Sequence, residues 1–587
     1  MQHTFHIPVL GLGYSIDTPL KIARYGISSV VSIVDDELTE RMRKFHAESN
    51  GKIFKAISKS ENDYRARRIT SYLDLLEDLV AEQFKDLCAQ EFTTGNDIVQ
   101  YFELLPDSAV LKQDYALMKL YPAGETKKVA QDFLRKMMAR GAIDVNIMAK
   151  VDKMNYTNGN YLGDENTDAL AALRGFAQSK LNSSVVLSAG MNPKLYSYLE
   201  NFQDFFPSEM GPSIKKIILK VSDFRSALIQ AKFLAKKGLW VSEFRIESGL
   251  NCGGHAFATE GYLLGPILEE FKQKRTAMRA ELFEMYARAL HQKDINIQVC
   301  PSQRLTVQGG IGTAKEHDFL IRHYGLDATG WGSPFLLVPE ATNVDLLTLE
   351  KLSKADERDF YLSNSSPLGI RFNNFKGSSI EEQRLERIAQ GRPGSPCKKK
   401  FLCNNTEFSQ EPICTASREY QHLKINQLQE MNLEQIELNK QIHLVTEKVC
   451  LCEGLCASTY LKYEITKPRE NTAVAICPGP NLAYFNRTYK LHEMVDHIYG
   501  KVNVLANCIR PHMFFKELDL YINYLAEELK HVVEQKKGRL DSFQQKLTEG
   551  ITYYQNLFSN FISETQDEMQ QGLIQLEKLQ AKLSTLT

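Results

Sequence analysis

The chain has 587 residues, more than one compact core ordinarily holds, so two or three domains are expected. Its 71 basic and 72 acidic side chains nearly balance, which argues against nucleic acid or an anionic membrane surface as the main partner. The N-terminus shows no signal peptide and no apolar run has the length of a membrane span, so we expect a cytoplasmic protein acting on a small-molecule substrate.

Short β-branched runs alternate with longer helical patterns in the first part of the chain, as in a parallel α/β sheet. The runs number eight, which predicts a closed (β/α)8 TIM barrel over residues 1–345. The predicted strands are Ile7–Leu12, Ser28–Val34, Asp144–Ala149, Ser184–Ser188, Lys216–Val221, Val241–Ile246, Leu305–Gln308 and Leu326–Trp331. Residues 35–138 are too long for one crossover and are interpreted as a mostly helical insertion. A further strand-like run, Ile295–Val299, has no place in this count.

The sequence changes character after the barrel. Residues 346–510 are predicted to form a Cys-rich α+β region, and residues 511–587 a helical hairpin with breaks at Gly538 or Gly550. An apolar stripe in the last helix is typical of packing. These C-terminal helices are also the expected contact surface for a second copy of the chain or for a partner enzyme.

Two glycine clusters follow the last two predicted strands. The first contains Gly309, Gly310 and Gly312 and leads into a helix, and the second contains Gly332 and Ser333. Glycine lets backbone N–H groups approach a phosphate, and a helix N-terminus favours negative charge. Either cluster alone is typical of a turn, but the pair after strands seven and eight of a barrel favours phosphate binding.

A motif directly after the sixth predicted strand carries the main family resemblance. Residues 249–255 read Gly-Leu-Asn-Cys-Gly-Gly-His. This resembles the Gly-x-Glu-Ala-Gly-Gly-His motif of nitronate monooxygenases and FMN-dependent enoyl-ACP reductases. The resemblance implies an FMN cofactor, close approach of Gly253 and Gly254 to the flavin, and a catalytic role for His255. Asn251 and Cys252 depart from the family, which has Glu and Ala there.

Weaker matches occur in the family's order over residues 7–145, with a large insertion, and then 145–340. They include Gly11 in the first strand, Asn146 in the third and Lys220 in the fifth, which the resemblance implies as further cofactor contacts. Arg245 and Glu247 alternate along the sixth strand, so they point either toward the barrel mouth or into a buried ion pair.

Most of the eleven cysteines lie in the region after the barrel. Clustered soft ligands in a reducing compartment suggest zinc or an iron–sulfur cluster, although cysteine is also a common buried apolar residue. The candidate metal ligands are Cys397, Cys403, Cys414, Cys450, Cys452, Cys456 and Cys477.

The sequence therefore predicts an FMN-dependent, nitronate monooxygenase-like oxidoreductase that oxidises a small carbon acid or reduces an activated double bond. The alternatives are an enoyl-thioester reductase with NAD(P)H as donor, in a pathway of the fatty-acid or polyketide type, and a flavin-binding assembly scaffold without turnover.

Overall fold

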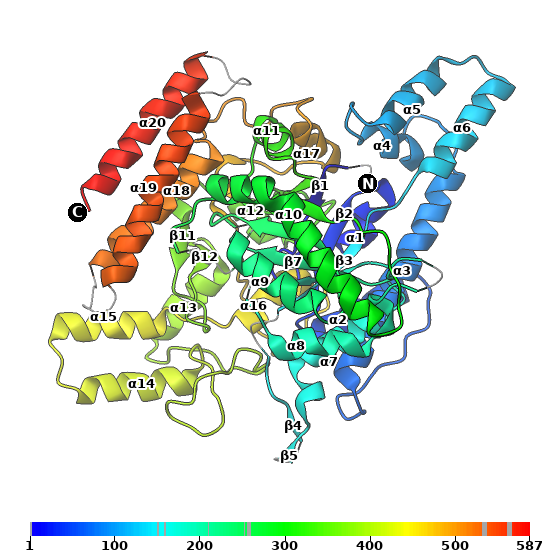
Figure 1. The fold of residues 1–587 in the computed structure, drawn as a ribbon. Helices are drawn as coiled ribbons and strands as arrows, with labels where there is room; N and C mark the ends of the chain where they lie inside the picture. Colours follow the sequence, from blue (N-terminus) through cyan, green and yellow to red (C-terminus); the bar gives the residue numbers. More distant parts are fainter. Residues whose placement is uncertain are drawn as a thin grey trace.

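The computed structural model describes residues 3–148, 152–157, 160–188, 190–208, 211–251, 253–254, 260–530, 537–559 and 566–586. Within these residues, parallel strands close into a barrel in the order β1-β10-β9-β8-β7-β6-β3-β2 (Figure 1). Their bounds are Phe5–Ile7, Ser28–Ser32, Ile143–Ile147, Ser184–Leu187, Lys216–Val221, Val241–Glu247, Arg304–Gln308 and Ala328–Gly330, for β1, β2, β3, β6, β7, β8, β9 and β10. The predicted (β/α)8 barrel is confirmed.

Two strand predictions need correction. β1 ends at Ile7, because the chain turns where Gly11 adopts a left-handed φ of 54° and Gly13 donates its amide to the Leu455 carbonyl. The strand predicted over Ile7–Leu12 is therefore mostly a loop. Residues Ile295–Val299 are not a strand but part of the connection into β9.

The lower part of the barrel interior contains a buried ion pair. The Arg245 guanidinium lies 2.8 Å from the Glu243 carboxylate and 3.5 Å from that of Asp144. Burial alone would raise the pKa of Glu243. The nearby Arg245 and Arg304 together have the larger, opposite effect and lower this pKa to about 2. Arg245 is therefore in a buried ion pair, but its partners are Glu243 and Asp144 and not Glu247, which lies at the C-terminal end of the strand.

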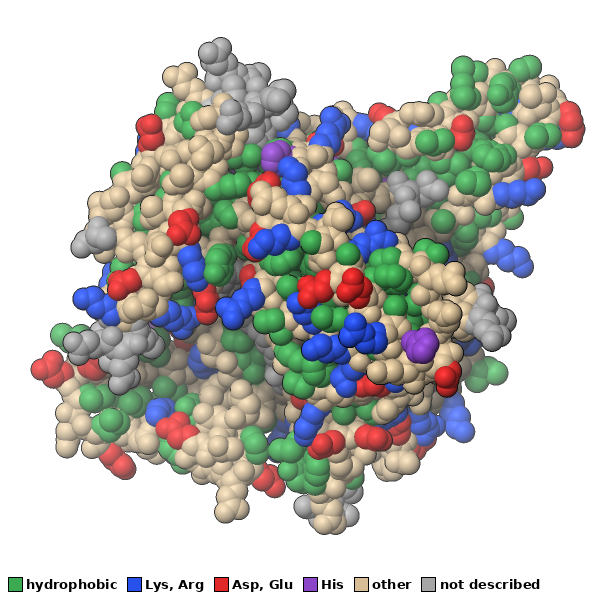
Figure 2. All heavy atoms as spheres, viewed as in Figure 1, with side chains coloured by type: hydrophobic (Ala, Val, Ile, Leu, Met, Phe, Trp, Pro, Cys, Tyr) green, Lys and Arg blue, Asp and Glu red, His purple; other side chains and the backbone are tan. Residues whose placement is uncertain are grey.

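Helices surround the barrel. α1 (Thr18–Ile22), α3 (Tyr64–Ala89), α7 (Asp168–Ala177), α8 (Pro193–Tyr198), α9 (Phe224–Ala235), α10 (Leu264–His291) and α11 (Ala314–Tyr324) follow successive strands. The segment between β2 and β3 also holds α2 (Asp36–Ser49), α4 (Asp97–Glu103), α5 (Val110–Leu120) and α6 (Glu125–Met137). α5 and α6 project from the body of the molecule (Figure 1). Figure 2 shows apolar side chains on this projection, and the exposed ones include Leu120, Val129 and Phe133.

The rest of the chain packs against the barrel. It contains α12 (Leu346–Ser353), the antiparallel pair β11 (Phe360–Ser363) and β12 (Phe372–Phe375), α13 (Ser379–Ala389), α14 (Arg418–Glu430), α15 (Gln435–Thr446), α16 (Leu451–Lys462), α17 (Leu491–Ile498), α18 (Met513–Leu529), α19 (Lys537–Ser559) and α20 (Gln566–Ser584). One hydrophobic core extends from Phe5 in the barrel to Leu583 in α20.

The C-terminal segment differs from a two-helix hairpin, because α18, α19 and α20 pack on one another. The predicted break at Gly550 is wrong, since this glycine lies inside α19. Gly538 is the second residue of α19, which begins after α18 has ended at Leu529, so a break next to Gly538 agrees with the structure. A Cβ at Gly550 would lie 2.5 Å from Leu263, so this glycine permits close helix packing. The apolar stripe of α20 is packed within the molecule, with Leu576 and Leu583 buried. Among the described residues, no helix is long and apolar enough to cross a bilayer.

Candidate active site at the barrel mouth

A polar group crosses the barrel mouth at the C-terminal ends of three adjacent strands. The Lys220 ammonium lies 3.0 and 3.1 Å from the two carboxylate oxygens of Glu247, and Gln308 donates its Nε2 to the same carboxylate at 2.8 Å. Strand pairing explains this, because Glu247 is directly opposite Gln308, and Lys220 opposite Arg245. The family resemblance implied Lys220, whereas Gln308 entered the sequence analysis only as the last residue of a predicted strand.

Two buried acceptors at this mouth lack a hydrogen bond. Asn146 near the end of β3 is 8% exposed, and its Oδ1 has no hydrogen-bond partner among the described residues. Gln308 Oε1 has none within hydrogen-bond geometry there either, although the buried His6 ring lies near it. Buried polar atoms without a partner are uncommon in native proteins and point to a missing water, ion or ligand. Asn146 and Lys220 thus place an acceptor and a cationic donor at the mouth, as a flavin ring with N–H and carbonyl groups requires.

The first glycine cluster forms a loop held from its outer side by residues of the C-terminal region. Arg510 donates to the Gly310 carbonyl at 2.5 Å, Asn481 to the Ile311 carbonyl at 2.8 Å, and His497 Nε2 lies 2.9 Å from the Gly312 carbonyl. The loop therefore has its carbonyl groups fixed in hydrogen bonds to three separate segments.

The amides of the same loop are used differently. Gly312 donates to Glu316 at 2.8 Å, and Glu316 is neutralised by Arg510 at 2.7 Å. The buried amides of Gly310 and Ile311, in contrast, have no acceptor among the described residues. Gly310 also has a φ of 78°, which a side chain rarely adopts. Two buried donors just before the N-terminus of α11 fit a phosphate group.

The second glycine cluster is also covered by the C-terminal region. Ser333 begins the short helix η5 (Ser333–Leu337), and its hydroxyl accepts a hydrogen bond from the Gly479 amide at 2.7 Å. Phosphate contacts from Gly332 and Ser333 stay predictions. A cofactor contact by Gly11 also stays a prediction. The contact of a Cβ at this position with Tyr14, at 2.8 Å, shows that the packing of the first loop itself requires glycine here.

The motif loop after β8 is described only in part, because Cys252 and His255 lie outside the described residues. Gly254 donates its amide to the Cys477 carbonyl at 3.2 Å, and a Cβ on Gly253 would lie 2.4 Å from that same carbonyl. The glycine at 253 is therefore required by the chain's own segment, whereas a Cβ at Gly254 would meet open space. Flavin contact by the two glycines stays a prediction, as does catalysis by His255.

The departure at Asn251 has a local explanation. Its φ is 50°, in the left-handed region that asparagine tolerates better than glutamate does, and its side chain accepts a hydrogen bond from the Gly253 amide at 3.2 Å. Asn251 therefore shapes the turn into the Gly-Gly pair.

Sequence reasoning missed the residues that hold these loops from outside, above all Glu517 and Arg510. Glu517 in α18 is 1% exposed and accepts hydrogen bonds from Ser248 Oγ at 2.8 Å, Gly249 N at 2.9 Å and Leu264 N at 2.8 Å. A lone acidic residue in an amphipathic helix gives no local signal of this role.

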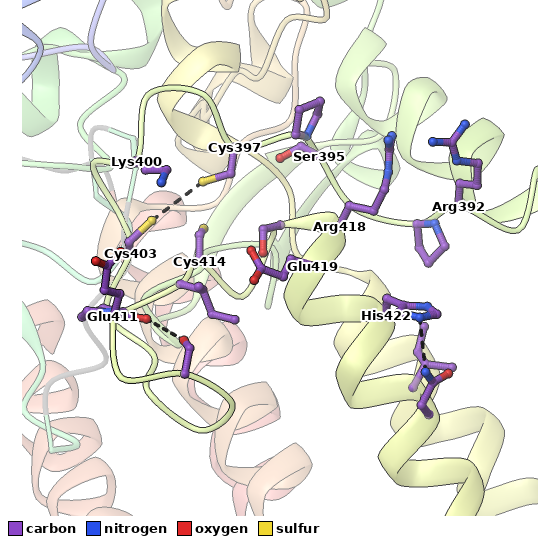
Figure 3. A pocket seen from close by; sticks show the side chains of 18 of the residues that line it. Arg392, Ser395, Cys397, Lys400, Cys403, Glu411, Cys414, Arg418, Glu419 and His422 are labelled. Atoms are coloured by element: carbon purple, nitrogen blue, oxygen red, sulfur yellow. Dashed lines mark hydrogen bonds between the residues drawn. The ribbon is translucent and has the colours of Figure 1, made fainter.

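The cysteines separate into two groups. Cys397 and Cys403 lie 3.8 Å apart, sulfur to sulfur, and line a cavity of about 1050 Å³ together with Cys414 (Figure 3). The neighbouring Cys452 thiol lowers the pKa of Cys450, against the effect of burial. Cys456 instead donates to Asp35 at 3.4 Å, and Cys477 lies against the motif loop.

The predicted metal site gains no support from this arrangement. The described residues contain no group of three or more His, Cys, Asp or Glu side chains that could hold a metal ion. The described residues that line the 1050 Å³ cavity all come from segment 391–429. None of them belongs to the barrel.

Comparisons with known proteins give distant likenesses. No family model and no curated protein matches the chain. A solved structure of FabK from Thermotoga maritima is similar at 13% identity, over 68% of this chain and 85% of that chain, with a TM-score of 0.31. The enoyl reductase domain of MlnA, from the macrolactin biosynthesis cluster of Bacillus amyloliquefaciens, is similar at 14% identity, over 67% of this chain and 91% of that chain, with a TM-score of 0.33. We therefore base the function on the barrel mouth itself.

Proposed function

We propose that this chain is an FMN-dependent oxidoreductase that oxidises a small carbon acid, as nitronate monooxygenases do, or reduces an activated double bond. The observation that supports this most directly is the pair of buried amides at Gly310 and Ile311, which have no acceptor among the described residues. Their position after β9, at the C-terminal face of the barrel, is where barrels of this class hold phosphate.

The residues at the mouth have separable roles in this proposal. The Gly310 and Ile311 amides bind the phosphate, and Lys220 and Asn146 orient the ring as cationic donor and neutral acceptor. Glu247 keeps the Lys220 ammonium in place through contacts of 3.0 and 3.1 Å. FMN, when bound, supplies the electron transfer. His255, named by its motif, moves the proton at the substrate carbon.

The first experiment is the visible spectrum of the purified protein, followed by heat release and quantification of FMN. We expect about one equivalent of FMN, and a colourless protein that FMN does not reconstitute would overturn the proposal. Gly310→Asp should lose most of the bound FMN, because it places a carboxylate beside the phosphate.

Two further variants separate charge from steric effects. Gly310→Ala has the same Cβ contact with Leu250, at 2.4 Å, without the charge. Gly325→Asp is matched in backbone conformation, with a φ of 65° and no atom within 4 Å of the added Cβ. We expect FMN content to fall in the order Gly325→Asp, Gly310→Ala, Gly310→Asp. Equal loss in both Gly310 variants would remove the electrostatic part of the interpretation.

Turnover assays separate the two reaction types. The holoprotein is reduced anaerobically, in one series with an alkyl nitronate and in the other with NADPH. Reduction by the nitronate supports carbon-acid oxidation. Reduction by NADPH followed by reoxidation with an enoyl thioester supports double-bond reduction. A flavin that neither donor reduces would favour the scaffold alternative.

A further inference from the structure

A cavity of about 320 Å³ lies at the rim of the barrel mouth, and we call it the rim cavity. It is lined by residues that follow β2 and β3, including Glu37 in α2 and Lys153 after β3, and by two segments of the C-terminal region, 398–401 and 467–470. Its lining comes from sequence segments that are far apart, and basic side chains outnumber acidic ones in it.

The acidic side chains of the rim cavity are already engaged within the chain. Arg41 lies 2.7 Å from both Glu37 and Glu470. Asp36 pairs with Arg65 at 2.8 Å, and Asp168 accepts a hydrogen bond from Asn155 at 2.9 Å. Glu453 is 7% exposed and accepts from Cys450 at 3.9 Å. None of these carboxylates is left to neutralise the remaining cations.

Three cations in the lining lack a carboxylate partner. Among the described residues, no acidic side chain lies within ion-pair distance of Lys153, Lys398 or Arg469. Lys398 donates to the Arg469 carbonyl at 3.0 Å, which places the two residues side by side. Arg469 has a φ of 60°, a left-handed conformation unusual for arginine. Like charges gathered from separate segments repel one another unless an anion offsets them.

The barrel order places the rim cavity across the mouth from the phosphate loop. β3 lies halfway round the barrel from β9, whose loop holds the Gly310 and Ile311 amides. A small cavity of about 20 Å³ at the ends of β2 and β3 is lined by Val34, Ile147 and Met148, and it shares Arg65, Asp168 and Phe401 with the rim cavity. A flavin anchored at β9 would therefore have its ring between its own phosphate and the rim cavity.

We propose that the rim cavity binds the phosphate or pyrophosphate group of an organic ligand that reacts at the flavin. Lys153, Lys398 and Arg469 hold the anionic group, and the reacting end of the ligand extends past Phe401 toward the end of β3. The assignment of the reacting end rests on the proposed function. The anion site itself does not, because it depends only on the charges and the cavity.

The primary test measures binding of inorganic pyrophosphate to the purified full-length protein by calorimetry. The double variant Lys398→Ala/Arg469→Ala should weaken binding by about tenfold or more, since it removes two charge-assisted contacts to the anion. The matched control is Lys236→Ala/Arg322→Ala, which removes a lysine and an arginine from exposed positions on the outer helices. Equal affinity in the two double variants, or no binding to the parent, would overturn the anion site.

A second measurement distinguishes the sources of the phosphate. NADPH is one arm, a coenzyme A thioester is the second, and the corresponding N-acetylcysteamine thioester, which lacks phosphate, is the third. The double variant should raise KM at least tenfold for one of the two phosphate-bearing compounds and leave the phosphate-free thioester unchanged. A protein without flavin would fail all turnover arms but still bind pyrophosphate, so failure of the proposed function is distinguishable. Weakened pyrophosphate binding with unchanged KM in both phosphate arms would overturn the link to the flavin reaction.

Discussion

The carboxylate of Glu517 lies 2.9 Å from the amide of Gly249, and this contact joins the C-terminal helix α18 to the start of the motif loop. Its second oxygen accepts the amide of Leu264 at 2.8 Å, so one side chain holds both ends of segment 249–264. Within the described residues, Glu517 has no Lys or Arg within ion-pair distance. Burial raises its pKa, and its three hydrogen bonds lower it by less.

Replacing Glu517 by glutamine should loosen this loop. The amide nitrogen of glutamine cannot accept a hydrogen bond, so at least one of the buried donors loses its partner, at a cost of about 1–3 kcal/mol. We expect a lower Tm and faster hydrogen exchange at residues 249–264, with FMN content within twofold of the parent. Asp519→Asn, on the same helix at a more exposed position, is the control. Unchanged exchange in this segment would show that Glu517 does not position the loop.

Lys220→Met should weaken FMN binding by about tenfold, because it removes one charge-assisted contact. It also leaves Glu247 without its cation at the mouth. The matched control is Lys216→Met, which changes an exposed lysine at the other end of the same strand. The FMN dissociation constant, measured by fluorescence titration, should change only in the first variant. A similar change in both would indicate an effect on β7 as a whole.

His255→Ala should reduce turnover per bound flavin by roughly a hundredfold to ten-thousandfold, the range for loss of a general acid or base. Flavin content should stay near that of the parent, since we propose that other loops bind the phosphate. The measurement is steady-state turnover normalised to flavin absorbance. Near-normal turnover with poor flavin retention would assign His255 a structural role instead.

Acid should destabilise the fold through two buried histidines. Burial lowers the pKa of His3 and that of His317 to about 4, from an ordinary value of 6.5. Both are neutral in the folded state until about pH 4, whereas the unfolded chain binds protons below 6.5. Their stabilisation is therefore complete above pH 6.5 and decreases as pH falls toward 4, each contributing up to about 1.4 kcal/mol per pH unit.

His317→Gln should flatten this dependence when Tm is followed from pH 7 to pH 4. Glutamine can still donate to and accept from the hydroxyls of Thr4 and Thr329, which contact His317 at 3.1 and 2.7 Å. His422→Gln changes an exposed histidine and should leave the slope as it is. A slope unchanged in the His317 variant would show that its protonation does not contribute.

The sequence by itself determined the barrel, because β-branched runs and helical periodicity are local properties that the residues of each segment carry. The family resemblance pointed to Lys220 and Asn146, and the pair of glycine clusters pointed to the loop at Gly310; their contacts with FMN stay predictions. Arg245 and Glu247 show the limit of such reasoning. Alternation placed both inside the barrel, but only strand pairing separated the buried ion pair from the mouth.

The outer half of the candidate site was decided only by the tertiary structure. Glu517 and Arg510 reach loops that lie some 200 residues or more before them in the chain, and no periodic pattern connects such distant positions. The same holds for Cys477, which sequence clustering grouped with the other cysteines. Its carbonyl instead lies against Gly253 and Gly254, because long-range packing against the motif loop, and not spacing along the chain, sets where it lies.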